Sequence, residues 1–113
     1  MKAVLIMGSD SDRGHAEKIT SSLEKLGVKF ETFVASAHKS PEKVLEIIRT
    51  HKKGDKIVFI TIAGRSNALS GFVAANTEKP TFACPPFKDM VDMGINIHST
   101  LQMPSNTPVL TIL

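Results

Sequence analysis

Short apolar runs alternate along this chain with segments whose apolar residues recur every three or four positions. This alternation constrains the fold more than any other feature. The apolar runs predict strands at residues 3–7, 28–34, 57–62, 81–84 and 109–113. Four helices are predicted between these strands. The first has an apolar face of Ala16, Ile19, Leu23 and Leu26 and ends before Gly27. The second begins at Ser40 and Pro41 and is closed by Gly54, and the others cover 67–75 and 95–101. Because strands that alternate with helices pair in parallel, we expect one open parallel sheet with helices on both faces.

The first and third strands, 3–7 and 57–62, are mostly apolar, which is typical of strands that are covered on both faces. We therefore expect both to lie inside the sheet. Ligands of such sheets bind beyond the carboxyl ends of the strands, near the point where the strand order reverses. This rule directs attention to four loops, at residues 8–12, 35–40, 63–67 and 84–87.

Length and composition exclude several classes of protein. The 113 residues predict a single domain, 1–113. No apolar run approaches the roughly 18 residues of a transmembrane helix, and the apolar start is too short for a signal peptide, so we expect no membrane partner and a cytoplasmic location. A lone cysteine, Cys84, excludes a disulfide framework and a cysteine-rich zinc site. The net charge of +3 is small and scattered, which argues against a nucleic-acid partner but suits a small anionic ligand.

The first loop, Gly8-Ser9-Asp10-Ser11-Asp12, joins a strand to a helix. A tight-turn glycine, two hydroxyls and the free amides of a helix start can together hold a phosphate. A carboxylate there can instead accept hydrogen bonds from ribose hydroxyls. A plain cluster of helix-capping residues explains the same pattern equally well. The two aspartates have no third acid at the spacing of a calcium loop.

The second loop places Ser36, His38 and Lys39 within four residues at a strand end. Histidine exchanges a proton near neutral pH, and lysine neutralises a phosphate or a carboxylate as a point charge. A lone histidine in a loop is more often a surface residue than a catalytic one. The position of this loop beside the first loop shifts the balance toward chemistry.

The third loop, residues 63–67, is rich in small residues that let a ligand approach the backbone. Its Asn67 amide could hold a carboxylate or a carbonyl oxygen, although Ser66 or Asn67 can also cap the next helix. In the fourth loop we expect Cys84 to be buried and inert. No metal site is predicted, because the remaining histidines lack ligand spacing. We expect Met90 and Met93 to be packing residues.

Five ordered motifs together resemble one enzyme family. They are Met7-Gly8-Ser9-Asp10-Ser11-Asp12, Ser36-Ala37-His38-Lys39-Ser40-Pro41, Ala63-Gly64-Arg65-Ser66-Asn67, Cys84-Pro85-Pro86 and Leu101-Gln102-Met103-Pro104-Ser105. They look like the PurE family of purine biosynthesis, whose enzymes act on aminoimidazole ribonucleotide. The resemblance covers essentially the whole chain. It implies a three-layer α/β sandwich around a five-stranded parallel flavodoxin-like sheet of order 2-1-3-4-5, here without the family's C-terminal helices.

The family has two activities, and the motifs resemble one of them more closely. The mutase branch has arginine after the histidine of the second loop and a Gly-Gly-Ala-Ala-His run in the third. This chain has Lys39 and Gly64-Arg65-Ser66-Asn67 instead, as in the branch that carboxylates 5-aminoimidazole ribonucleotide (AIR) at C4 with carbon dioxide. The mutase that acts on the N5-carboxylated nucleotide remains an alternative. A shortened, inactive member that only binds a phosphate ligand is a second alternative.

The resemblance also implies roles for individual residues. His38 would transfer the proton. Asp12 would bind the ribose hydroxyls. The phosphate would be surrounded by Ser9, Ser11, Ser36 and Lys39, and the carbon dioxide site would be lined by Gly64, Ser66 and Asn67. The same loops contribute Gly8, Ala37, Ala63 and Arg65 to the predicted substrate site. No cofactor is expected, and the family's octamer implies a homo-oligomer with active sites between subunits.

Overall fold

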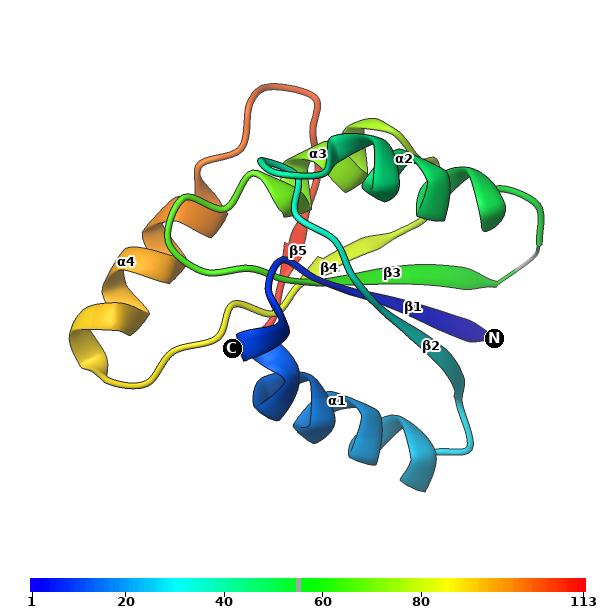
Figure 1. The fold of residues 1–113 in the computed structure, drawn as a ribbon, viewed down its shortest axis with the longest axis horizontal. Coiled ribbons are helices and arrows are strands. Elements are labelled where there is room, and N and C mark those ends of the chain that lie inside the picture. The colour runs from blue at the N-terminus through cyan, green and yellow to red at the C-terminus, as the bar shows by residue number, and fades with distance from the viewer. Residues whose placement is uncertain (55) are drawn as a thin grey trace.

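The computed structural model describes residues 1–54 and 56–113, and the sheet within them is the one that the sequence predicts. Five parallel strands lie in the order β2-β1-β3-β4-β5 (Figure 1). They are β1 (Lys2–Met7), β2 (Lys29–Val34), β3 (Ile57–Ile62), β4 (Thr81–Ala83) and β5 (Leu110–Thr111). The expected flavodoxin-like order is confirmed, with β1 and β3 inside the sheet.

Helices cover both faces of this sheet. They are α1 (Arg13–Lys25), α2 (Pro41–Thr50), α3 (Leu69–Ala75) and α4 (Met90–Leu101), with one 3-10 turn, η1 (Asp10–Asp12), before α1. In Figure 1, α1 lies below the sheet and α2 and α3 lie above it, while α4 lies to the left, where the strands end. The layers are therefore α1, the sheet, and α2 with α3.

The core follows the two-residue period of β1. Val4 and Ile6 point into a cluster with α2 and α3, whereas Leu5 and Met7 point into a second cluster with α1. Side chains alternate across a strand, so a continuous apolar run fills two cores at once. In the register of the sheet, Met7 is opposite Val34 of β2 and Ile62 of β3, so the three strands end at the same level. The loops that follow them consequently meet at one edge.

Some local predictions were wrong. Leu26 lies beyond the end of α1 and is 76% exposed, so it does not belong to the buried face. Met90 is 78% exposed and is not a packing residue. The fourth helix begins five residues earlier than predicted, because the Asp89 side chain caps it by accepting a hydrogen bond from the Asp92 amide. The last predicted strand, 109–113, pairs only over Leu110–Thr111.

One ionic cluster ties the edge strand β2 to the rest of the domain. The Glu31 carboxylate accepts hydrogen bonds from Lys2 Nζ at 2.9 Å and from His51 Nε2 at 2.6 Å. The His51 ring is buried edge-on between Phe33 and Phe59, and its Nδ1 lies 2.8 Å from the Ile47 carbonyl oxygen. His51 thus has the structural role that its lack of ligand spacing indicates.

We expect the stability of this fold to fall as the pH decreases through the pKa of Glu31. The hydrogen bond from Lys2, and next that from His51, lower this pKa below its ordinary value of 4.5. A carboxyl group with a lowered pKa stabilises the folded state fully above its unfolded pKa, and this contribution disappears as the pH falls through the folded pKa. Urea unfolding from about pH 7 to about pH 3 should therefore give a flatter profile for Glu31→Gln.

The control for this measurement is Glu24→Gln, which changes an exposed glutamate on α1. It should retain the pH dependence of the wild-type protein. If Glu31→Gln and the wild type lose stability in parallel below pH 4.5, the cluster does not contribute as described.

Candidate functional site

Three of the four predicted loops enclose one cavity at the carboxyl ends of β1, β2 and β3. The cavity has a volume of about 290 Å³. Its lining contains eleven of the thirteen predicted site residues, which are Gly8, Ser9, Asp12, Ser36, Ala37, His38, Lys39, Ala63, Gly64, Arg65 and Ser66. The two absent residues are Ser11 and Asn67. Residues that are up to 58 positions apart in the chain therefore share one small space.

The first loop turns its two aspartates in different directions. Asp10 pairs at 2.5 Å with the Arg13 side chain on the exposed surface. Asp12 is partly buried in the cavity, and this burial raises the pKa of its carboxyl group. A hydrogen bond with the Ser9 backbone and the charge of His15 lower the same pKa, but by less. The Ser9 and Ser11 hydroxyls lie 2.9 Å apart, and Ser9 accepts a hydrogen bond from the Ser11 amide, so capping and ligand binding can coexist here.

The second loop is closed by its own serines. The Ser40 amide and hydroxyl both donate to the Ser36 carbonyl oxygen, while the Ser36 hydroxyl accepts from the Lys39 amide. This tight turn carries His38 and Lys39 on its exposed side. In the part of the chain that the structure describes, neither side chain makes a hydrogen bond or an ion pair. Both are thus available to a ligand in the cavity.

Asn67 of the third loop points away from the cavity into a buried polar network. Its Nδ2 donates to the hydroxyls of Ser70, at 2.7 Å, and Thr100, at 3.1 Å, while its Oδ1 accepts from the Ser70 amide. The Ser70 hydroxyl also lies 2.7 Å from the hydroxyl of Thr61 on β3. Of the two interpretations of Asn67 from sequence, this geometry matches the capping of α3. Its contact with a carboxylate stays a prediction.

A second, more open cavity of about 450 Å³ adjoins the first. The two share Ser9, Asp12, Gly64 and Arg65, and the second also includes Ser11. Its other walls come from α1, the fourth loop and α4, through His15, Lys18, Pro86, Phe87, Lys88, Asp92 and Asn96. None of these seven is among the thirteen predicted site residues, although Pro86 and Phe87 belong to the fourth predicted loop. Lys18 and Lys88 add positive charge, which suits an anionic ligand.

His15, in the wall of this second cavity, is hydrogen-bonded to the backbone of Cys84. Burial lowers the pKa of His15, and a hydrogen bond with the Cys84 backbone opposes that shift. The Cys84 thiol is buried, and burial raises its pKa. A thiol with a raised pKa remains protonated at neutral pH and is a poor nucleophile, as expected for an inert cysteine. Among residues 1–54 and 56–113, no three His, Cys, Asp or Glu side chains gather closely enough to hold a metal ion.

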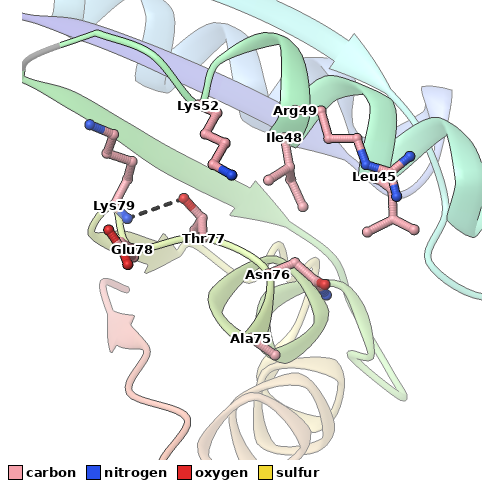
Figure 2. A pocket seen from close by; sticks show the side chains of 9 residues that line it. All are labelled: Leu45, Ile48, Arg49, Lys52, Ala75, Asn76, Thr77, Glu78 and Lys79. Carbon is pink, nitrogen blue, oxygen red and sulfur yellow. Dashed lines mark hydrogen bonds between the residues drawn. The ribbon is translucent and has the colours of Figure 1, made fainter.

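A larger cavity of about 580 Å³ lies elsewhere, between α2 and the end of α3 (Figure 2). It contains none of the predicted site residues. Arg49 and Lys52 line it beside the last turn of α2, where cations complement the partial negative charge of a helix end. Lys79 donates through Nζ to the Gly54 carbonyl oxygen at 2.6 Å. These cations are explained by helix ends and a loop contact, so we assign no ligand to this cavity.

Comparisons with known proteins show which family this chain belongs to. The family model described as AIR carboxylase matches residues 2–113. The phosphoribosylaminoimidazole carboxylase of Archaeoglobus fulgidus is 53% identical over 113 residues, and that of Treponema denticola is 45% identical over 111. The N5-carboxyaminoimidazole ribonucleotide mutase of Methanocaldococcus jannaschii is 44% identical over 108 residues. Both activities thus occur among the relatives.

The alignments cover almost all of this chain but only part of the relatives. They span 100% of the chain and 62% of the A. fulgidus protein, and 96% of the chain and 69% of the T. denticola protein. For the M. jannaschii mutase the shares are 96% and 66%. The crystal structure of T. denticola PurE superposes with a TM-score of 0.92 at 43% identity, covering 99% of this chain and 71% of that one. No helix among the described residues is long and apolar enough to cross a membrane.

Proposed function

The chain belongs to the AIR carboxylase family, and on that premise we propose that it carboxylates AIR at C4 with carbon dioxide, reversibly, in purine biosynthesis. The observation that carries this proposal is the cavity of about 290 Å³ in which His38, Lys39, Asp12 and Gly64 converge from three loops. The cavity offers a base, a cation for a phosphate, a carboxylate for hydroxyls and, at Gly64, backbone that a substrate can approach closely.

The first and second loops then bind the phosphate and the ribose of the nucleotide. Lys39, Ser36, Ser9 and Ser11 surround the phosphate, and Asp12 accepts hydrogen bonds from the ribose hydroxyls. Since burial raises the pKa of Asp12, its carboxylate is more easily protonated than an exposed one. We infer that nucleotide affinity decreases as the pH falls through the raised pKa of Asp12, because protonation removes this acceptor. The small residues of the third loop leave space for carbon dioxide next to the ring.

The chemistry follows from the enamine-like character of the aminoimidazole ring. C4 attacks the carbon of carbon dioxide, so a carbon–carbon bond forms and one C–O π pair moves onto oxygen to give a carboxylate. The now tetrahedral C4 loses its proton to the His38 imidazole, and the C–H electron pair restores the aromatic ring. A positioned base contributes about 10²–10⁴ in rate. The reverse reaction returns the proton from His38 to C4 and releases carbon dioxide.

The mutase of the same family is the second candidate, favoured by the 44% identity to the M. jannaschii protein. One assay separates the candidates. The protein is given either AIR with bicarbonate or the N5-carboxylated nucleotide, and formation of the C4-carboxylated product is followed. We expect product from AIR. Product from the N5-carboxylated nucleotide alone would identify a mutase, and product from neither would indicate an inactive, ligand-binding member.

Lys39→Ala should weaken binding of AIR by about tenfold or more, because a charge-assisted hydrogen bond to the phosphate contributes about 1.5–3 kcal/mol. Calorimetric titration with AIR measures the dissociation constant. Lys43→Ala is the matched control, since Lys43 is also exposed, lies four residues later in the first turn of α2 and does not line the cavity. Equal dissociation constants for wild type and Lys39→Ala would contradict the phosphate role.

We also propose that the protein works as a homo-oligomer, with the family's octamer as the expected form and the cytoplasm as its location. The outer side of α4 supports this, since Met90, Val91, Ile95 and Leu101 are all exposed there. An apolar helix face is unfavourable in water and typical of a contact surface. Native mass measurement tests the proposal, and a monomer would contradict it.

A further inference from the structure

Helix α4 is held to the domain by polar side chains. Its buried residues are Asn96 and Thr100, whereas its exposed side contains large apolar residues. Asn96, Ser99 and Thr100 are spaced three and four positions apart, so they share one face of the helix. That face contacts the third loop, where the Ser99 hydroxyl accepts from the Asn67 amide at 2.6 Å and Thr100 accepts from the Asn67 side chain. The position of α4 and the shape of the third loop therefore depend on each other.

Asn96 makes the most consequential of these contacts. Its Oδ1 accepts a hydrogen bond from the Arg65 backbone amide, and its Nδ2 donates to the Pro86 carbonyl oxygen, both at 2.5 Å. The side-chain amide of Asn96 thus connects the third loop to the fourth loop. Asn96 is only 2% exposed, so water does not replace either partner readily.

The backbone that Asn96 holds is in an uncommon conformation. Arg65 has a φ angle of 54°, in the left-handed region that non-glycine residues rarely adopt. Next to it, a Cβ atom on Gly64 would lie 3.1 Å from Asn96 Nδ2 and 3.3 Å from Cγ, so the glycine backbone rests directly against this side chain. Gly64, Arg65 and Ser66 line the cavity. The side-chain amide of Asn96 therefore determines the position of this wall of the cavity.

We propose that Asn96 is a positioning residue for the carboxylation, which keeps Gly64 and Arg65 at the distance from His38 that the reaction requires. This inference rests on the proposed function. Asn96 itself does not touch the nucleotide in our assignment. Its removal should consequently lower kcat while the KM for AIR changes little, because the phosphate and ribose contacts belong to the first and second loops.

Three variants of the native protein test the proposal. Asn96→Ala removes both contacts. Asn96→Asp retains an acceptor for the Arg65 amide but places an oxygen against the Pro86 carbonyl. Ile57→Ala is the stability control, because it removes core volume at the opposite end of β3, away from the cavity. The measurements are kcat and KM for AIR, the melting temperature, and hydrogen exchange of the peptide that contains Arg65.

We expect Asn96→Ala to lose about 10- to 100-fold in kcat, the scale that a displacement of about 1 Å costs. Ile57→Ala should keep its kcat despite a lower melting temperature. The Arg65 amide should exchange faster in Asn96→Ala and stay protected in Asn96→Asp. The Asn96→Asp variant should also keep a higher kcat than Asn96→Ala, regardless of which variant has the lower melting temperature.

Two results would overturn the proposal. One is an Asn96→Ala variant whose kcat stays within about twofold of Ile57→Ala at 25 °C, and the other is an Arg65 amide whose exchange does not change. If the wild-type protein turns over neither nucleotide, the proposed function itself fails. The exchange measurement then still decides whether Asn96 anchors the loop, because it needs no substrate.

Discussion

Replacing His38 by asparagine should lower the turnover of AIR by about 10²–10⁴ while its dissociation constant stays near the wild-type value. His38 lies on the exposed side of the tight turn at the cavity, and its ring is not engaged within the described part of the chain. Asparagine occupies a similar space and can donate and accept hydrogen bonds, but it cannot take up the C4 proton. Loss of the base therefore affects the chemical step and leaves the phosphate and ribose contacts in place.

The matched control is His98→Asn, which makes the same change at an exposed histidine on α4 outside both cavities of the candidate site. It should leave turnover unchanged. Steady-state assays with AIR and bicarbonate, together with calorimetric titration, measure the two quantities separately. A His38→Asn enzyme with near wild-type turnover would require another proton acceptor in the cavity. One that no longer binds AIR would instead place His38 in substrate binding.

The second large effect concerns stability. Asn67→Ala should lower the free energy of unfolding by about 2–4 kcal/mol, because it leaves the buried Ser70 amide and the Thr100 hydroxyl without the partner they have now. A loss of this size corresponds to a fall of about 10–20 °C in melting temperature for a domain of this length. Activity should fall at the same time, because Asn67 and its neighbours hold the third loop.

Asn76→Ala provides the comparison. Asn76 directly follows α3, is exposed, and donates through its side chain to the Phe72 carbonyl oxygen. Its replacement should change stability by no more than about 0.5 kcal/mol. Thermal and urea unfolding measure the stability of the two variants relative to the wild type. If Asn67→Ala loses activity but keeps the stability of Asn76→Ala, the asparagine acts on the substrate rather than in the network.

Most of the sheet could be predicted from sequence because the signals that specify it are local. Residues 3–7 are all apolar, and because side chains alternate across a strand, Val4 and Leu5 lie in opposite cores. The loops could also be predicted, because parallel strands must end at a common edge. The thirteen site residues within them follow from the resemblance to the family, and eleven of these line one cavity there. Predictions failed where burial depends on what lies nearby in space, as at Leu26 and Met90.

Local patterns in the sequence predict which segments become strands and helices and which loops lie at the ligand-binding edge, because periodicity and turn residues act over a few neighbouring positions. The strand order 2-1-3-4-5 follows instead from the resemblance to the PurE family. The contacts that hold the third loop become visible only once the chain is folded. The Asn96 side chain reaches an amide 31 residues away, and Asn67 reaches a hydroxyl 33 residues away. The residues next to a polar side chain in the sequence do not indicate which distant group will be its hydrogen-bond partner. That choice is made when α4 packs against the loops, since a buried amide must find a partner there.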